Sequence, residues 1–442
     1  MRYLEFWEKF QAAEQAAEVF DIRTIGFQLY PMIRTRLYYQ LAQELGLFNN
    51  PHPNQEPKEA AKANPDLLSG LAQSKVVVVP FVRKIQGLDV YSQPIQEALA
   101  GESLCLEVAD PEANIDLERI RAYGREKYDR VVYELMLKEK VRDVRDRWAK
   151  MAEVFEAEFG IGLGKFAEFP NWLVRRYISE CMAFRDYFDA VGAKKLYIVN
   201  AYSSPAVVVG AKQAGAKVIE IQHGFISKYH PAYSYPNIRI QSAPNKLMVW
   251  GSYWAKAANF PKGLKPLVTG PSTQFLEQRQ LVALQPKKSK TILFTSQGAL
   301  GAQLFSQAIA WANSLPDHQI TYRLHPNESL SDYPGKDLPE NLTISHKTPG
   351  FLELLGQHEY LVGGFSTTLY EGLAFGLKVI VLPLAGFENV QQAIDLGDMT
   401  LASGDTSTAY LTQLLTEANL AQNPYSYYAK DFNLKRALRA GF

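Results

Sequence analysis

Short apolar runs that alternate with helical patterns constrain the fold of this chain most strongly. The run Lys75–Phe81 is continuous and rich in valine, as in strands that are buried on both faces of a parallel sheet. Similar runs occupy 195–200, 217–222, 246–251, 291–295, 319–324, 360–362 and 378–382. Strands that alternate with helices in this way predict parallel sheets with helices on both faces. The runs form two blocks, so we predict an α/β protein with two doubly wound, Rossmann-like domains.

The length of 442 residues also favours two domains, because single hydrophobic cores stop growing at about 250–300 residues. We place the N-terminal domain at 1–268, with a helical lead-in at 1–65, and the C-terminal domain at 269–424. The aromatic and basic segment 425–442 is predicted to return to the N-terminal domain. Open α/β sheets bind ligands at the carboxyl ends of their strands. Two such domains in tandem are therefore expected to face each other across a binding cleft.

Charge and hydropathy restrict the partners of this protein. The 47 basic and 46 acidic residues give a net charge of +1, which provides no global field for nucleic acid. No apolar run reaches the roughly 18 residues of a membrane span, and the N-terminus lacks the apolar region of a signal peptide. We expect a cytoplasmic protein. Arg34 and Arg36 flank an apolar helical stripe, which leaves peripheral contact with the inner membrane surface open; solvated arginines on an ordinary helix are the alternative.

Two polar stretches at strand ends predict an anion site. Tyr322–Pro326 (YRLHP) ends one strand, and Gly363–Gly372 (GGFSTTLYEG) ends another and opens a helix. A helix start offers unpaired backbone N–H groups and a positive dipole end, both of which bind phosphate. A third strand ends in Ser296-Gln297-Gly298 and is expected to line the same crevice. The candidate nucleotide-binding residues are Arg323, His325, Ser296, Gln297, Gly298, Gly364, Ser366, Thr367, Thr368 and Glu371.

Several of these residues also have a purely structural interpretation. His325 could cap the turn before Pro326. Arg323 could pair with a buried acid such as Glu371 instead of a phosphate. The hydroxyls of Ser366–Thr368 could cap their helix and do nothing more.

His223 is the candidate catalytic residue of the N-terminal block. It follows the strand 217–222 in the sequence Gln222-His223-Gly224, so it is expected to face the cleft. Group transfer with inversion needs a base that accepts the proton of the attacking hydroxyl, and a histidine with a near-neutral pKa suits that task. A ligand of the donor phosphate or carboxylate, and a structural residue, are the alternatives for His223.

Motifs for metals and for redox cofactors are missing from the sequence. It contains no Asp-x-Asp motif, no His-Glu-x-x-His motif and no cysteine cluster, so we expect no metal. It also lacks G-x-G-x-x-G at the strand ends, which argues against a nicotinamide or flavin enzyme.

The segments Gln222–Gly224, Arg323–Pro326 and Gly364–Gly372 together resemble motifs of GT-B glycosyltransferases of bacterial surface polysaccharide synthesis, of the capsule and lipopolysaccharide type. They are similar to those of the CMP-sugar-using sialyl- and Kdo-transferases and of the teichoic-acid polyol-phosphate transferases. The resemblance covers most of residues 195–395. It implies a GT-B fold and an inverting, metal-independent transfer of a sugar to a surface-glycan or lipid-linked acceptor. The implied donor is a CMP-linked acidic sugar such as Kdo or a sialic-type sugar.

The resemblance also implies roles for single residues. His325 is expected to contact the nucleotide phosphate and to assist catalysis, Glu371 to hold the ribose hydroxyls, and His223 to act as the base. Sialyltransferases use an acidic base in a D/E-D/E-G motif, which is not intact in this sequence. No cofactor is implied beyond the nucleotide-sugar donor. The alternatives are a CDP-polyol phosphotransferase, a UDP-sugar epimerase and a non-catalytic nucleotide-sugar binding protein.

Overall fold

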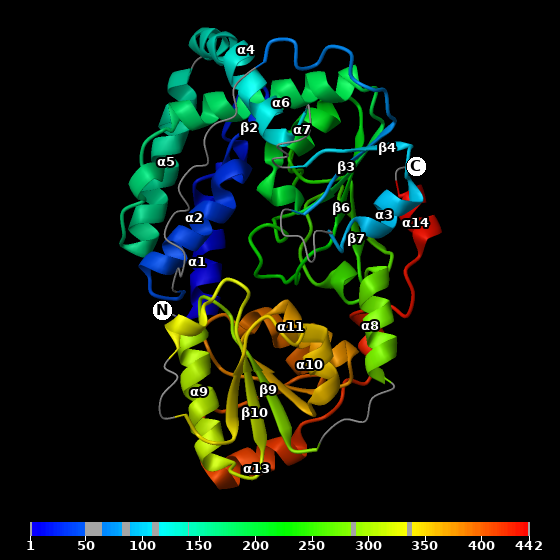
Figure 1. The fold of residues 1–442 in the computed structure, drawn as a ribbon. Helices are drawn as coiled ribbons and strands as arrows, with labels where there is room; N and C mark the ends of the chain where they lie inside the picture. The colour runs from blue at the N-terminus through cyan, green and yellow to red at the C-terminus, as the bar shows by residue number, and fades with distance from the viewer. Residues whose placement is uncertain are drawn as a thin grey trace.

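Two six-stranded parallel sheets form the centres of two domains, one above the other in Figure 1. The computed structural model describes residues 2–48, 64–81, 89–107, 115–139, 141–283, 289–333 and 338–440. Helices cover both faces of each sheet. The prediction of an α/β fold with two doubly wound, Rossmann-like domains is therefore confirmed.

The first sheet has the strand order β4-β3-β5-β6-β7-β8. Its strands are β3 (Val76–Val79), β4 (Ser103–Cys105), β5 (Lys195–Val199), β6 (Lys217–Ile221), β7 (Lys246–Val249) and β8 (Lys265–Val268). Around it lie α1 (Tyr3–Ala16), α2 (Tyr30–Glu44), α3 (Gln93–Ala98), α4 (Leu117–Lys138), α5 (Val141–Phe159), α6 (Asn171–Ala190) and α7 (Pro205–Gln213), with a small hairpin of β1 (Arg23–Thr24) and β2 (Phe27–Gln28). The strand order reverses between β3 and β5, where such sheets bind ligands.

The second sheet has the order β11-β10-β9-β12-β13-β14 and reverses between β9 and β12. Its strands are β9 (Thr291–Thr295), β10 (Gln319–Arg323), β11 (Leu342–Ser345), β12 (Tyr360–Gly363), β13 (Lys378–Val381) and β14 (Thr400–Leu401). The remaining helices are α8 (Thr273–Ala283), α9 (Gly301–Ser314), α10 (Phe351–Gln357), α11 (Thr367–Ala374), α12 (Gln391–Asp395), α13 (Thr408–Glu417) and α14 (Leu434–Arg439).

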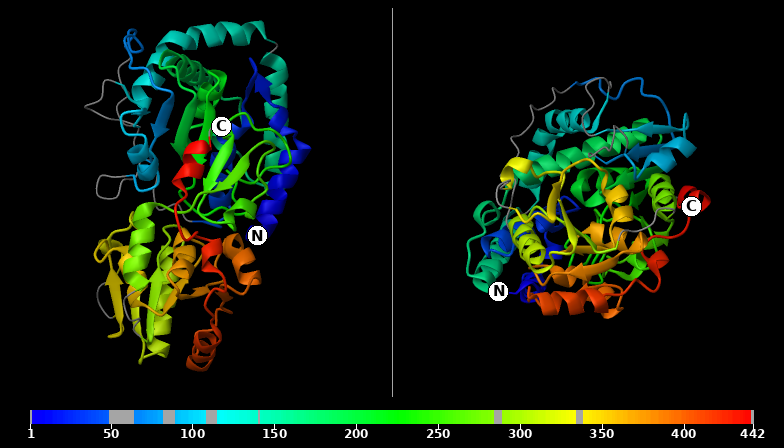
Figure 2. Two further views of the ribbon diagram at one scale, coloured as in Figure 1. Left: turned by 90° about the vertical axis from the view of Figure 1, so that its right-hand side faces the viewer. Right: turned by 60° about the horizontal axis from the view of Figure 1, so that its bottom comes forward.

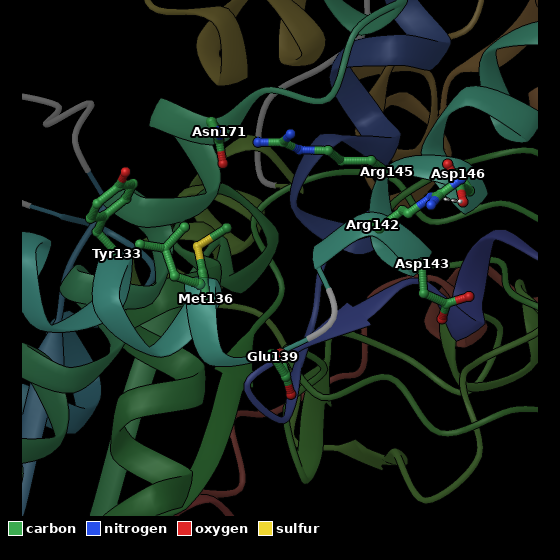
Figure 3. A pocket seen from close by; sticks show the side chains of 9 residues that line it. Tyr133, Met136, Glu139, Arg142, Asp143, Arg145, Asp146 and Asn171 are labelled. Carbon is green, nitrogen blue, oxygen red and sulfur yellow. Dashed lines mark ion pairs between the residues drawn. The ribbon is translucent and has the colours of Figure 1, made fainter.

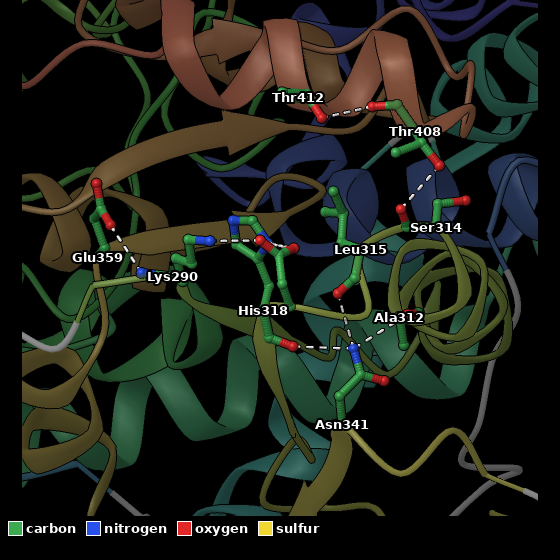
Figure 4. Close-up of polar contacts among 10 residues, drawn as sticks. Lys290, Ala312, Ser314, Leu315, His318, Asn341, Glu359, Thr408 and Thr412 are labelled. Carbon is green, nitrogen blue, oxygen red and sulfur yellow. Dashed lines mark hydrogen bonds and ion pairs between the residues drawn. The ribbon is translucent and has the colours of Figure 1, made fainter.

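Asn341 directly precedes the edge strand β11, and its side chain points toward the end of α9 (Figure 4). Its Nδ2 donates to the carbonyl oxygens of Ala312 at 3.1 Å, Leu315 at 3.0 Å and His318 at 2.9 Å. Carbonyls at the end of a helix such as α9 have no partner within the helix, so this side chain satisfies groups that burial would otherwise leave unpaired.

The chain crosses between the domains twice, and two glycines permit the crossing. Gly270 has φ +92°, and a Cβ built on it would lie 2.1 Å from the carbonyl oxygen of Asp431. A Cβ on Gly251 would lie 2.1 Å from the carbonyl oxygen of Ser426. Beyond this crossing α14 lies against the first sheet and beside α3 (Figures 1 and 2). Only glycine allows backbones to approach this closely.

Aromatic rings fill the junction between the domains. Trp254 and Tyr370 have ring centroids 4.6 Å apart, and Phe275 stacks on Tyr428 at 4.4 Å. Tyr428 also stacks on Trp250 at 5.1 Å, so rings from both domains form one continuous group. Large rings contribute much buried area and specific geometry, which holds the two sheets in a defined relation.

The prediction that Arg34 lies on a solvated helix flank is wrong, because its side chain is 0% exposed. Arg34 Nε lies 2.5 Å from Glu14 Oε1, and Arg34 Nη1 donates to the carbonyl oxygen of Ser234 at 2.8 Å. Paired and hydrogen-bonded in this way, the charge can be buried. Arg36 is exposed. Among the described residues, no helix is long and apolar enough to cross a membrane.

Candidate active site

The loops that follow β6 and β12 touch across the domain junction. The backbone N–H of Phe225 donates to Thr367 Oγ1 at 3.0 Å, and the rings of Phe225 and Phe365 lie 6.1 Å apart. Two residues of extended chain span at most about 7 Å, so His223 lies within that distance of Phe225. The structure therefore brings the Gln222-His223-Gly224 segment to the first residue of α11.

His223 lies in a largely apolar setting. Its Nε2 is 3.3 Å from the Tyr202 hydroxyl, and its ring centroid is 5.2 Å from that of Phe81. Its Nδ1 is buried and has no partner among the described residues. Burial lowers the pKa of His223 to about 4, below the near-neutral value expected from the sequence. The imidazole is therefore neutral at neutral pH and can accept a proton.

The three hydroxyls at the start of α11 all have protein partners. Ser366 Oγ is the N-cap and accepts from the backbone N–H of Thr368 at 3.3 Å. Thr368 Oγ1 donates to Thr295 Oγ1 at 3.3 Å, and Thr367 Oγ1 accepts from the N-terminal domain as described above. In the described part of the chain we find no acceptor for the Thr367 N–H. An anion at this segment could therefore bind to the Thr367 N–H and would be stabilised by the positive end of the α11 dipole.

Glu328, which the sequence analysis missed, ties the tips of β9 and β10 together. Its Oε1 accepts from the hydroxyls of Ser296 and Tyr333, both at 2.8 Å, and its Oε2 accepts from the His325 backbone N–H at 2.7 Å. His325 Nδ1 accepts from the backbone N–H of Asn327 at 3.3 Å. The sequence did contain a signal for this role, because Glu328 follows the strand-tip residue His325 by only three positions.

The predicted binding residues Ser296 and Gln297 at the tip of β9 form hydrogen bonds with other parts of the C-terminal domain. The Ser296 hydroxyl is buried against Glu328, so it positions the strand tip and does not point at open space. Gln297 Oε1 accepts from the backbone N–H of Phe365 at 3.1 Å, which fixes β9 to the loop after β12. A Cβ on Gly364 would lie 3.0 Å from Leu300 Cδ1 and 3.3 Å from Gln297 Oε1, so a larger residue fits there only if these side chains shift. Gly298 follows in the turn before α9.

The alternative that Arg323 pairs with Glu371 is wrong, because the described contacts of its guanidinium are to other groups. Its Nη1 donates to Ser345 Oγ and to the carbonyl oxygen of Pro349, both at 2.8 Å, and its Nη2 donates to the carbonyl oxygen of Lys347 at 2.9 Å. The guanidinium is thus engaged with the loop after β11, because β10 and β11 pair in register at Arg323 and Ser345. Its evident role is to position that loop.

Glu371 opens onto a cavity of about 470 Å³ at the domain junction. Rings of Tyr91, Trp250 and Tyr428 line it, together with the start of α10 at 350–353. Burial raises the pKa of Glu371 to about 7. The Tyr428 hydroxyl is buried and has no partner among the described residues. Unpaired buried polar groups are rare in folded proteins, so a water or a ligand is expected to complete the hydrogen bonding of this hydroxyl.

The cavity and the start of α11 are adjacent. Glu371 follows Thr367 by four residues, which is a rise of about 6 Å along the helix. Aromatic walls with a few polar groups are typical of small-molecule sites. This arrangement can hold an anion at the helix start, a hydroxyl-bearing ring at Glu371 and a flat ring among the aromatic side chains.

Within the described ranges, no group of three His, Cys, Asp or Glu side chains is arranged to hold a metal ion.

Comparison with known proteins finds no matching protein-family model and no matching curated protein. Among solved structures, the chain is similar to Acinetobacter baumannii MurG, with 12% identity over 83% of this chain and 99% of that chain and a TM-score of 0.47. It is similar to the glycotransferase of kitacinnamycin, with 14% identity, coverage of 84% and 96%, and a TM-score of 0.46. It is also similar to the UDP-GlcNAc 2-epimerase from Neisseria meningitidis, with 14% identity, coverage of 83% and 98%, and a TM-score of 0.46. These similarities are too low to indicate what this protein does, so its function has to be argued from the residues of the site.

Proposed function

We propose that this protein is an inverting, metal-independent glycosyltransferase that uses a nucleotide-sugar donor. The observation that carries the proposal is the contact between Phe225 N–H and Thr367 Oγ1 at 3.0 Å. This contact supports the proposal because it joins the loop that carries His223 to the helix start that we propose binds the donor phosphate. A transferase needs both within reach of one substrate, the first for the acceptor hydroxyl and the second for the leaving phosphate.

The C-terminal domain holds the donor in this proposal. The donor phosphate accepts from the Thr367 N–H at the positive end of α11. Glu371 accepts from the ribose hydroxyls, and the base lies among the rings of the 470 Å³ cavity. His325, whose Nδ1 accepts from the backbone N–H of Asn327, contacts the donor phosphate from the tip of β10 in this proposal.

The reaction that follows is a single displacement at the anomeric carbon. An acceptor hydroxyl oxygen forms the new bond as the bond from the anomeric carbon to the phosphate oxygen breaks. The electron pair of the broken bond leaves with the nucleotide, and the hydroxyl proton passes to His223. Burial lowers the pKa of His223 to about 4, and the negative charge of a bound donor would raise it.

The proposed donor is a CMP-linked acidic sugar, such as Kdo or a sialic-type sugar, and the proposed acceptor a surface glycan or a lipid-linked glycan at the cytoplasmic membrane face. The similarity of Arg323–Pro326 and Gly364–Gly372 to CMP-sugar transferases supports this choice. Thermal unfolding with CMP, CDP, UDP, GDP and their sugars tests it. A nucleotide at 100 times its Kd stabilises the fold by about 2.7 kcal/mol.

Product analysis with donor and acceptor tests the reaction itself. A new glycosidic bond, formed only when both substrates are present, is the expected result. A phosphodiester product would instead identify a polyol-phosphate transferase. Epimerised donor in the absence of acceptor would identify an epimerase, and binding without turnover a sensor. Each of these three outcomes contradicts the proposal.

A further inference from the structure

A separate concavity of about 260 Å³ lies on the N-terminal domain where α2, α4, α6 and the start of α7 meet. These helices lie together in the upper part of Figure 1. Its lining combines three arginines with an exposed tryptophan and two serines: Arg36, Arg121, Arg176, Trp172, Ser203 and Ser204. This concavity does not include His223, Thr367 or Glu371 of the candidate active site.

Positive charge exceeds negative charge in this concavity. One carboxylate, that of Glu180, lies 2.8 Å from Arg176 Nε, 3.2 Å from Arg125 Nη1 and 3.8 Å from Arg121 Nε. Glu180 is 8% exposed, so its charge is shared among three guanidiniums. Glu118 pairs with Arg121 and is the second acid of the group. Three guanidiniums against two carboxylates leave donors that a further anion can use.

Arg36 and the start of α7 add to the positive potential. Arg36 is exposed on α2 and has no ion pair among the described residues. Ser204 is the N-cap residue of α7, yet its side chain makes no capping hydrogen bond. The helix dipole therefore directs its positive end, without a side-chain cap, toward the same concavity as the three lining arginines.

Trp172 gives the concavity an aromatic wall and is 65% exposed. A tryptophan this exposed is unusual in a folded protein, and tryptophan with arginine is the combination enriched at binding hot spots. The indole face suits the C–H face of a sugar ring, the serine hydroxyls suit its hydroxyls, and the guanidiniums suit a carboxylate or phosphate.

The chain connects this concavity to the candidate base. Ser203 directly follows Tyr202, whose hydroxyl is 3.3 Å from His223 Nε2. Three residues of chain span at most about 11 Å, so Pro205 at the rim lies within that distance of Tyr202. The rim of the concavity and the contact to His223 thus belong to one short segment, 202–205, and an acceptor held in the concavity would extend along it to reach His223.

We propose that this concavity binds the anionic group of an acidic saccharide acceptor, either a carboxylate or a phosphate. The inference rests on the proposed function and names the class of its acceptor. Arg36 and Arg176 hold the anion and Trp172 stacks on the ring beside it.

A larger hollow between α4 and α5, of about 520 Å³, lacks this character (Figure 3). Arg142 and Arg145 line it together with Glu139, Asp143 and Asp146, so acids outnumber bases. Arg142 also lies 3.9 Å from Asp146 in an ion pair along α5. The excess of positive charge thus distinguishes the concavity at α7.

Titration with three saccharides tests the proposal by calorimetry. The probes are a glucuronic-acid-containing disaccharide, glucose 6-phosphate and neutral cellobiose. We expect the full chain to bind at least one acidic probe at least about tenfold more tightly than cellobiose, and the preferred probe distinguishes a carboxylate from a phosphate site. Arg36→Gln and Trp172→Ala each weaken that binding about tenfold. Arg130→Gln, a control on α4 whose side chain is 90% exposed outside the concavity, binds as the wild type does.

Equal affinity for acidic and neutral probes, or wild-type affinity in both variants, would overturn the inference. Circular dichroism and nucleotide binding of the same variants show that they remain folded. Nucleotide binding by the wild type without any preference for acidic saccharides contradicts this inference alone. A preference for acidic saccharides without nucleotide binding contradicts the proposed donor site alone.

Discussion

Two residues in and after strand β6, Glu220 and His223, show how burial sets protonation in this protein. Glu220, which is 2% exposed, accepts from the Ala201 N–H at 3.1 Å and from the Tyr233 hydroxyl at 3.0 Å. Burial raises the pKa of Glu220 to about 7, and it lowers the pKa of His223 to about 4. Both shifts favour the neutral form, because a low-dielectric setting disfavours charge of either sign.

Replacing Glu220 with glutamine should flatten the dependence of stability on pH. The folded pKa of Glu220 is raised from 4.5 to about 7, so its contribution is present below pH 4.5 and is lost as pH rises to about 7. His223 acts in the opposite direction, since stability falls as pH drops from 6.5 toward 4, but both proteins share that contribution. Urea unfolding at pH 5 and pH 8 should show a decline in the wild type that is about 1–3 kcal/mol larger than in Glu220→Gln. Parallel declines would refute the raised pKa.

The variant His223→Asn should bind nucleotide normally and lose transfer. A positioned general base contributes about 10²–10⁴-fold to a rate, so kcat should fall by that amount. Tyr202→Phe, which removes only the hydroxyl 3.3 Å from Nε2, serves as the control and should lose much less. Steady-state assays with a defined acceptor measure both variants. Turnover near the wild-type level in His223→Asn would exclude it as the base.

At the scale of elements, the strand tips were easier to predict than the contacts that hold them. Apolar runs located β5, β6, β9 and β10, and the Ser-Thr-Thr sequence located the start of α11, because these are local patterns. The role of Arg323 depends on the register of β10 with β11, and that of Glu328 on a neighbouring strand tip. The burial of Arg34 depends on Ser234, two hundred residues along the chain. Local sequence does not carry such long-range contacts.

Removing the carboxylate that joins two strand tips should weaken the donor site. In Glu328→Gln the charged acceptor of the Ser296, Tyr333 and His325 donors is lost. We expect the free energy of unfolding to fall by about 1–2 kcal/mol and nucleotide affinity to fall about tenfold. Glu340→Gln, at an exposed position of the same domain, is the matched control. Chemical unfolding and calorimetry measure both quantities, and unchanged nucleotide affinity would leave Glu328 with no role in the site.

At the scale of the whole molecule, side chains of Asn389 and Thr367 make polar contacts that help to fix the orientation of the two domains. Asn389 of the C-terminal domain donates from Nδ2 to the Tyr3 hydroxyl at 3.0 Å and accepts from Ser227 Oγ at 2.6 Å. Thr367 makes the corresponding contact at the site, to Phe225. Both join the second domain to the domain that carries His223, so in the proposed reaction they would align the donor with the base.

The variant Thr367→Val should therefore reduce transfer more than donor binding. Valine keeps the backbone N–H that we propose donates to the donor phosphate, but it removes the oxygen that accepts from Phe225. We expect kcat to fall about tenfold or more while nucleotide affinity changes less than about threefold, because misplacement of reacting groups lowers the rate of the chemical step. Parallel loss of both quantities would show that the hydroxyl serves the nucleotide directly.

The central claim is that a nucleotide occupies the start of α11 with its ribose at Glu371. Calorimetric titration of the wild type and of Glu371→Ala with CMP and UDP, and with their 2′,3′-dideoxy analogues, tests it most directly. We predict that the wild type binds at least one ribonucleotide and prefers it over its dideoxy form by about tenfold, and that Glu371→Ala loses this preference. Absence of nucleotide binding, or an equal preference in Glu371→Ala, would contradict the account.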